Sequence, residues 1–252
     1  MDDDSVLDNT QGEHGILAGM HAGAIHIGTS TISPRASTRL AELHACQGSQ
    51  YVASPVAGRI DAAAAGKLIA FVAGKPAAIE RSRPVMDRYA AKIVVLGEDP
   101  AAAASLKLVV NFFGVSLLEL IGQAFVFAEK RGLPPELVGG MLKELLHHPA
   151  MPVYLDKIRT RSFDDDLGFT LDGGLKDVEL MLEAAAEVHV PLPYASLVRD
   201  KCIAAQAYGM GQRDWSVLTE VTRINAGQKI ESKTAAVPSE KPEKISSAEG
   251  RS

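Results

Sequence analysis

The sequence of 252 residues predicts an α/β region followed by an all-α region. In the first hundred residues, short apolar runs alternate with segments of helical periodicity, which is typical of a parallel sheet covered by helices. After Gly97 the periodicity is helical throughout, and proline or glycine stands at each junction between helices. Because the last residues contain almost no large apolar side chains, we expect them to be disordered. The predicted domains are residues 1–97 and 98–226, followed by a tail at residues 227–252.

Four short apolar runs in the α/β region predict its strands. Each run is five to seven residues long and is followed by glycine or polar residues. The expected strands are residues 24–28, 50–55, 67–73 and 92–96.

Two helices are expected between these strands. For the first, Ser33 fits an N-cap, Pro34 fits the first helical position, and Gly48 closes the apolar face. The second occupies residues 75–91 and is either broken or started near Pro84.

The all-α region begins with a long apolar helix. Its apolar stretch contains Glu119, and a carboxylate in the middle of a bilayer costs a few kcal/mol, so a buried core helix is favoured over a membrane span. The expected helices are residues 100–131, 134–147, 150–160, 174–188, 193–209 and 214–226.

Composition excludes several classes of function. A net charge of -5 and a pI near 5.8 leave no basic stripe for nucleic acid. The acidic runs at residues 2–4 and 164–166 lack the ligand alternation of a calcium loop, so we expect solvated turns and no metal. Cys46 and Cys202 have no metal-binding spacing, and the N-terminus does not have the pattern of a signal peptide. We therefore expect a cytoplasmic protein without a membrane partner.

Two polar residues interrupt the long apolar helix one turn apart. Lys107 and Asn111 lie within roughly 40° of each other around the helix axis. A lone lysine near a helix start often extends its ammonium group to water. A buried amide without a partner, however, costs about 1–3 kcal/mol. A lysine that faces a cleft beside an amide can exchange a proton with a polar substrate and orient it.

Five segments, taken in chain order, resemble the motifs of the β-hydroxyacid dehydrogenase family. This family includes 3-hydroxyisobutyrate and tartronate semialdehyde dehydrogenases and is related to 6-phosphogluconate dehydrogenase. The resemblance covers about residues 5–225, and the fifth segment matches more weakly than the others. The segments are "IGTSTISP" (27–34), "SPVAGRIDAAAAGKLIAFVAG" (54–74), "KLVVN" (107–111), "LKDVELMLEAAAEVHVPLP" (175–193) and "GMGQRDWSVL" (209–218).

The resemblance implies a fold and a set of substrate-side residues. The fold would be a partial Rossmann-type parallel sheet followed by a helical domain of the 6-phosphogluconate dehydrogenase C-terminal type. Lys107 matches the catalytic lysine that takes a proton from the substrate hydroxyl, and Asn111 matches the asparagine that positions the substrate. Ser30 and Thr31 match the substrate-contacting loop, and the backbone at Gly58 matches the loop that holds a carboxylate.

The resemblance also implies a cofactor and an assembly. Lys176 matches a lysine near the nicotinamide end of NAD or NADP, and Asp177 matches its neighbour on the helix. Without the surrounding motif, these two residues would be interpreted as an exposed charged pair. The expected substrate is a small 3-hydroxy acid with a carboxylate, and a homodimer or tetramer would form through the helical domain.

The sequence departs from the family pattern at the substrate side. The family's aspartate before the serine loop is Gly28 here, and the serine and second glycine of the carboxylate loop are Ala57 and Arg59. Arg59 adds a cation, so a different substrate or an imine-reductase-like branch stays open. Lys107 favours the hydroxyacid branch, because imine reductases usually carry another proton donor at that position.

A further departure concerns the cofactor. The first hundred residues contain no G-x-G-x-x-G turn, which in this family receives the pyrophosphate. We therefore expect an N-terminally truncated chain that is inactive as it stands. Two hypotheses follow: a dehydrogenase whose cofactor half is missing from this sequence, or a catalytically inactive relative that acts as a dimeric binding or assembly module.

Overall fold

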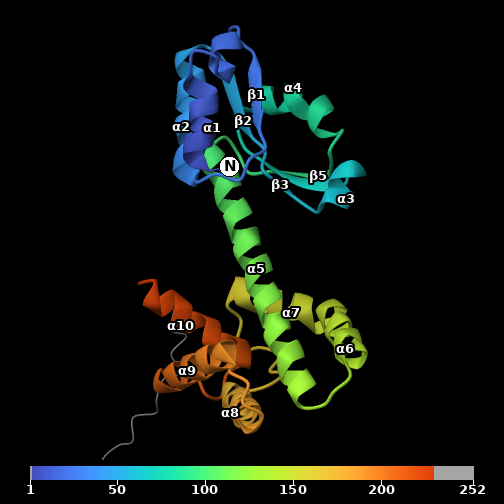
Figure 1. Cartoon of the computed structure of the whole chain (residues 1–252). Coiled ribbons are helices and arrows are strands. Elements are labelled where there is room, and N and C mark those ends of the chain that lie inside the picture. The colour runs from blue at the N-terminus through green and yellow to red at the C-terminus, as the bar shows by residue number, and fades with distance from the viewer. Residues whose placement is uncertain (1, 230–252) are drawn as a thin grey trace, which may run out of the picture. The chain divides into compact units, whose positions relative to one another are not determined.

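The computed structural model describes residues 2–229, so most of the predicted tail at 227–252 lies outside the described residues. The chain forms two compact units that divide within one long helix, between Glu119 and Leu120 (Figure 1). The first unit is α/β and the second is helical, as the sequence predicts.

The first unit contains two small sheets that an antiparallel bridge between Ala53 and Ala73 connects. The β1–β2 and β4–β5 pairs are parallel, as expected, whereas β3 runs antiparallel to β4. The predicted strand at 50–55 ends at Ala53, and the separate strand β3 begins only after Pro55, because proline has no N–H to donate to a ladder. The strands are β1 (Ile25–Gly28), β2 (Gln50–Ala53), β3 (Val56–Ala57), β4 (Leu68–Val72) and β5 (Ala90–Val95).

The helices of this unit follow the predicted capping signals. The Ser33 hydroxyl accepts a hydrogen bond from the Ala36 N–H at 3.1 Å, and Pro34 occupies the first turn of α2. The helix α4 begins at Pro76 and continues through Pro84. Pro84 therefore neither starts nor breaks the helix, and both predicted alternatives were wrong. The helical elements are α1 (Asp3–Gln11), η1 (Ile16–Gly19), α2 (Pro34–Cys46), α3 (Ile60–Ala64) and α4 (Pro76–Met86).

The acidic run at the N-terminus is the start of a helix and not a solvated turn. Asp2 is the N-cap of α1 and accepts a hydrogen bond from the Ser5 N–H at 2.9 Å. Asp3 and Asp4 occupy the first turn, where carboxylates stabilise a helix through its dipole. Asp3 also accepts a hydrogen bond from the Ser33 N–H at 2.8 Å. The prediction of a turn at residues 2–4 was therefore wrong, because it treated the aspartates as charges and overlooked their capping geometry.

Helices cover both faces of the strands in the first unit. Along β2 and β4, Tyr51, Ala53 and Phe71 pack with Leu40 of α2, and Ala103 of the long helix belongs to the same cluster. The alternate positions of the same strands face α4 in a second cluster, because successive strand residues point to opposite faces. The members of that second cluster are Val52, Ala70, Val72, Ala78, Ile79, Met86 and Ala90.

The second unit contains every helix that the sequence predicts there. Its α8 begins three residues before the predicted residue 174, because the Thr170 hydroxyl caps the Gly173 N–H at 3.1 Å. Its core gathers around Phe163, Leu171 and Val217. The helices that follow the long helix α5 (Pro100–Lys130) are α6 (Pro135–His147), α7 (Ala150–Thr160), α8 (Leu171–Glu187), α9 (Pro193–Ala207), η2 (Trp215–Val217) and α10 (Leu218–Asn225).

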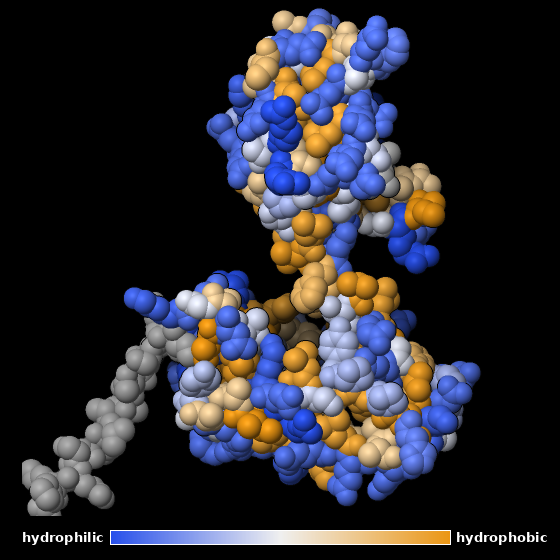
Figure 2. All heavy atoms as spheres, turned by 60° about the vertical axis from the view of Figure 1, so that its left-hand side comes forward, coloured by the Kyte–Doolittle hydropathy of each residue, from blue (hydrophilic) through white to orange (hydrophobic). Residues whose placement is uncertain are grey.

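The long helix α5 is not a core helix within this single chain. Only 11% of its most apolar window is buried, and Phe112 and Leu118 are each 71% exposed. Among the described residues, α5 is the one helix long and apolar enough to cross a membrane, which is weak evidence on length and composition alone. Hydrophobic residues are visible at the surface of both units (Figure 2). The expected burial of α5 was wrong for the isolated chain, because most of its large apolar side chains after Ala104 are exposed, although Leu106 and Val110 still pack against the first core.

Candidate functional site

Lys107 and Asn111 line an open depression of about 680 Å³ on the first unit. One wall is α5, which contributes residues between positions 107 and 118. The other wall is the end of β3 and the loop that follows it, which contribute Ala57 and Gly58. The structure therefore brings together three of the predicted site residues that lie far apart in sequence.

Lys107 is half-buried in this depression. Its partial burial lowers the pKa of the ammonium group below the ordinary value of 10.5, because desolvation disfavours the charged form. Within residues 2–229, no hydrogen bond or ion pair holds its Nζ atom. An ammonium group with all its donors available and a lowered pKa can exchange a proton with a bound hydroxyl or carbonyl group.

Asn111 lies one turn further along the same wall and is exposed. The expectation of a buried amide was wrong, so the cost of an unpaired buried group does not apply here. The exposed amide offers one acceptor and two donor hydrogens beside Lys107. This arrangement can orient a small polar molecule in the depression.

Gly58 is a position that only glycine fits. Its φ is +143°, and a Cβ atom there would lie 2.5 Å from the Leu68 Cδ2 atom. The next residue, Arg59, is 92% exposed at its side chain and pairs with Asp61 at 3.5 Å. Arg59 is absent from the lining of the depression, so the cation that the sequence adds to this loop faces solvent.

Ser30 and Thr31 follow the carboxyl end of β1 and do not line the depression. Ser30 is half-buried and Thr31 is exposed. Just before them, a Cβ atom at Gly28 would lie 2.7 Å from the Tyr51 ring, which leaves no room for an aspartate. Burial raises the pKa of that Tyr51 phenol to about 12, so the ring beside Gly28 is uncharged at neutral pH.

Lys176 and Asp177 belong to the second unit, on α8. The Lys176 Nζ atom lies 2.9 Å from the Asp177 Oδ1 atom, and the two side chains are 67% and 40% exposed. Their geometry is that of a solvated charged pair, and both interpretations made from the sequence remain open.

The sequence-based reasoning missed a buried charge centre in the second unit. The Lys157 ammonium lies 3.0 Å from the Asp214 carboxylate, and both side chains are buried. The only signal was Asp214 itself, within the weak motif at residues 209–218. Among the described residues, no group of three or more histidine, cysteine, aspartate or glutamate side chains could hold a metal ion.

Two family models match the chain and cover both units. The model for the NAD binding domain of 6-phosphogluconate dehydrogenase matches residues 1–97. The model for the NAD-binding domain of NADP-dependent 3-hydroxyisobutyrate dehydrogenase matches residues 101–222. Both models describe domains of nicotinamide-dependent oxidoreductases.

Curated relatives narrow this class. An uncharacterized oxidoreductase of Bacillus subtilis, YfjR, is 36% identical over 217 residues, which is 86% of this chain and 76% of the relative. The 2-(hydroxymethyl)glutarate dehydrogenase of Eubacterium barkeri is 31% identical and covers 87% of this chain and 72% of its own length. The chain belongs to the β-hydroxyacid dehydrogenase family.

Solved structures agree on the fold. An imine reductase from Myxococcus stipitatus in complex with NAD+ gives a TM-score of 0.76 at 18% identity, covering 88% of this chain and 77% of its own. At this identity the similarity concerns the fold alone. It confirms a Rossmann-type α/β unit followed by a helical unit.

Proposed function

We propose that this chain carries the substrate half of an NAD(P)-dependent dehydrogenase for a small anionic 3-hydroxy acid, with Lys107 as the proton-transfer residue. The observation that supports this most is the position of Lys107: half-buried, without a protein partner among the described residues, and beside a glycine-dependent loop. Relatives named 2-(hydroxymethyl)glutarate dehydrogenase and 3-sulfolactaldehyde reductase favour a small anion as substrate.

The proposed chemistry assigns Lys107 one proton. In the oxidation direction, the neutral amine accepts the proton of the substrate hydroxyl group as that oxygen becomes a carbonyl oxygen. In the reduction direction, the ammonium donates the proton back. A nicotinamide ring supplies the hydride acceptor or donor when it is bound. The lowered pKa of Lys107 supports this role, because the neutral amine is then more accessible near neutral pH.

Asn111 and Gly58 are the proposed substrate-holding residues. The Asn111 amide can hydrogen-bond to the same oxygen that exchanges a proton with Lys107. At Gly58 no side chain separates the backbone from the depression, so a carboxylate can approach the loop closely. In this proposal Lys176, on α8, serves the nicotinamide end of the cofactor, with Asp177 as its partner.

The cofactor fits these residues only in part. The depression offers a proton-transfer group and a loop, but the first hundred residues contain no glycine-rich turn to receive a pyrophosphate. For the 252-residue chain alone we expect no micromolar binding of NADH or NADPH. A fluorescence titration that showed such binding would overturn this expectation.

The second candidate function, an inactive assembly module, is favoured by the apolar surface of α5 and α6. None of the 13 residues of α6 is buried, although Leu137, Met141 and Leu145 form an apolar stripe on it. A helix with an exposed apolar stripe and no fully buried residue in its own chain can gain stability from a partner. We propose a second copy of this chain as that partner, in a homodimer or tetramer. Light scattering that gives the monomer mass of 26.7 kDa at micromolar concentration would contradict it.

One experiment separates the two candidates. Extending the reading frame upstream of Met1 should supply a strand and a G-x-G-x-x-G turn, and the extended protein should reduce NAD or NADP with a small 3-hydroxy acid. An in-frame stop close upstream would contradict the dehydrogenase and favour the assembly module.

A further inference from the structure

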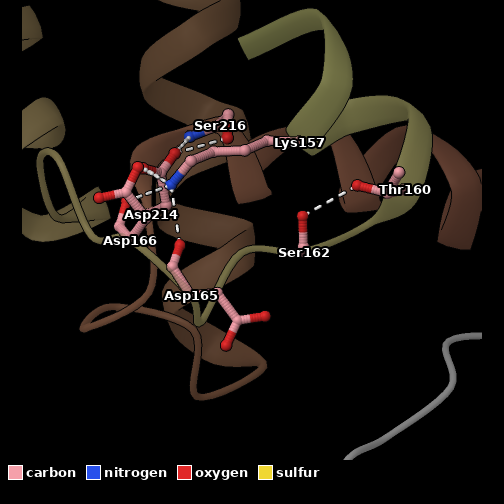
Figure 3. Close-up of polar contacts among 7 residues, drawn as sticks. All are labelled: Lys157, Thr160, Ser162, Asp165, Asp166, Asp214 and Ser216. Carbon is pink, nitrogen blue, oxygen red and sulfur yellow. Dashed lines mark hydrogen bonds and ion pairs between the residues drawn. The ribbon is translucent and has the colours of Figure 1, made fainter. Parts of the chain in front are cut away.

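The loop at residues 209–217, between α9 and α10, contains a buried carboxylate with every hydrogen bond satisfied. Asp214 is fully buried, and its Oδ1 atom accepts hydrogen bonds from the Ser216 N–H and hydroxyl at 3.1 and 2.5 Å. Its Oδ2 atom accepts from the Lys157 Nζ atom at 3.0 Å. The Lys157 ammonium also donates to the carbonyl oxygens of Asp165, at 3.0 Å, and Asp166 (Figure 3). Both buried charges are therefore compensated, which a stable buried ion pair requires.

The same loop accepts hydrogen bonds from the first backbone amides of α8. The Leu171 N–H donates to the Arg213 carbonyl at 2.9 Å, and the Asp172 N–H donates to the Gly211 carbonyl at 3.0 Å. The next amide of the turn is capped by the Thr170 hydroxyl. The first amides of a helix have no partner within the helix, so the loop replaces water there. These amides are consequently unavailable to an anionic ligand.

Side chains reinforce this connection. The Asp172 carboxylate accepts hydrogen bonds from Gln206 and Gln212, each at 2.7 Å. A Cβ atom at Gly211 would lie 2.7 Å from the same carboxylate, so the loop backbone lies directly against the side chain. The start of α8 is thus held at both its amides and its first acidic side chain.

Trp215 fixes the rotation of α8 about its axis. A Cβ atom at Gly174 would lie 3.2 Å from the Trp215 ring, which shows that the indole packs on the helix backbone. The ring also makes edge contacts with Tyr154 and Phe169 at centroid distances of 5.8 and 5.6 Å. With the indole on one side, α8 cannot turn without losing this packing.

The rotation of α8 decides where Lys176 points. Leu171, Leu175 and Val178 are buried on one face of the helix. At about 100° per residue, Lys176 lies roughly 100° to 160° around the helix axis from these residues. Its side chain therefore points away from the core and into solvent. A rotation by one residue would bring it toward the core.

We propose that residues 209–217 form a clamp on the first turn of α8, and that Asp214 is a positioning residue that holds this clamp and so sets the direction of Lys176. The importance of that direction for a nicotinamide cofactor rests on the proposed function. The clamp itself does not, and it can be tested on the chain without any cofactor.

The test compares amide hydrogen exchange in the full chain with that of Asp214→Asn. The amides of Leu171 and Asp172 should exchange at least about tenfold faster in the variant, while those of α9 change by less than about twofold. The matched control is Asp156→Asn, which removes an exposed ion pair from the same helix that carries Lys157 and should leave both amides unchanged. Unchanged exchange at Leu171 and Asp172, or an equal increase throughout the second unit, would overturn the clamp.

Two further measurements cover the case in which Asp214→Asn does not fold. Ser216→Ala removes one hydrogen bond to Asp214 and should give a smaller increase at the same two amides. Trp215 is the only tryptophan, so its emission reports the clamp directly and should shift to longer wavelength in both variants. An emission spectrum identical to wild type in both would contradict the proposal.

The effect on Lys176 is measured separately. The Cε resonance of isotope-labelled Lys176, assigned with Lys176→Arg, should shift in Asp214→Asn and not in Asp156→Asn. If the resonance stays fixed while the two amides open, the clamp does not position Lys176. A failure of the dehydrogenase function would appear only in activity assays and would leave these resonances and exchange rates unaffected.

Discussion

Lys107 in the first unit is half-buried and Lys157 in the second is buried, and their ammonium groups have opposite surroundings. Lys157 donates to two carbonyl oxygens and one carboxylate, so its three donors are used within the protein. Lys107 has no such acceptor among the described residues, and it faces an open depression. A lysine whose donors are all bound by protein acceptors stabilises the fold. A lysine without protein acceptors can donate to a substrate.

The largest expected effect is a loss of catalytic rate when Lys107 is replaced. In a form of the protein that oxidises a 3-hydroxy acid, Lys107→Ala should lower kcat by about 10²–10⁴-fold, because proton transfer in the transition state is lost. Cofactor affinity and the midpoint of denaturation should change little. Lys107→Arg is the sharper control, since arginine keeps the charge but does not release a proton near neutral pH. Activity of the arginine variant within tenfold of wild type would refute the proton-transfer role.

The next effect concerns the stability of the second unit. Lys157→Met leaves the buried Asp214 carboxylate without its counter-charge, and the free energy of unfolding should fall by about 3–5 kcal/mol. Urea denaturation followed by Trp215 emission measures this loss. The matched control is Arg159→Met on the same helix, which breaks an exposed ion pair and should cost less than about 1 kcal/mol. Equal losses of unfolding free energy in the two variants would show that the buried ion pair contributes no more to stability than the exposed one.

A pH effect distinguishes the first unit from the second. The His26 Nδ1 and His44 Nε2 atoms are 2.9 Å apart, and burial lowers the pKa of His44 from 6.5 to about 4. His44 binds a proton more readily in the unfolded state than in the folded state. The free energy of unfolding is therefore highest above pH 6.5 and decreases as the pH falls toward 4. The loss should reach about 3 kcal/mol for the first unit. In contrast, the pKa of Asp214 is lowered, so its contribution persists until the pH falls below its ordinary value of 3.8. Denaturation of His44→Asn that kept the full dependence on pH would exclude this cause.

The smallest expected effect tests the loop opposite Lys107. Gly58→Ala places a Cβ atom against Leu68 at a φ of +143°, which should cost about 1–3 kcal/mol of stability. Gly114→Ala is the matched control, since this helical glycine lines the same depression and has no atom within 4 Å of the added Cβ. That change should be neutral or stabilise by up to about 1 kcal/mol. The thermal unfolding midpoints of the two variants are measured and compared. A Gly58→Ala midpoint equal to that of wild type would show that the loop changes conformation to accept the Cβ atom.

The sequence predicted those parts of the fold that local chemistry determines. The cap at Ser33, the proline at the start of α2 and the junctions between the later helices are local signals, and the structure confirms them. The break at Pro55 and the helix after Asp2 were missed, although both have local causes in the missing proline N–H and in side-chain capping.

The site was predictable only where a motif marked it. The structure places Lys107, Asn111 and Gly58 around one depression, and the roles that the family resemblance implies for them stay predictions. The exposure of Asn111 and of the α5 surface could not be predicted, because apolar periodicity does not tell whether the covering partner is the same chain or another one. The clamp around Asp214 depends on contacts between residues far apart in sequence, such as Lys157 and Asp214, which are 57 positions apart, and no local pattern reveals them.

The most direct measurement for the central claim is the titration of Lys107 in the intact chain. The Cε chemical shift of isotope-labelled Lys107, assigned with Lys107→Arg, should titrate with a pKa below the ordinary value of 10.5, because partial burial disfavours the charged ammonium group. A Lys107 pKa at or above 10.5 would contradict the assignment of this residue to proton transfer.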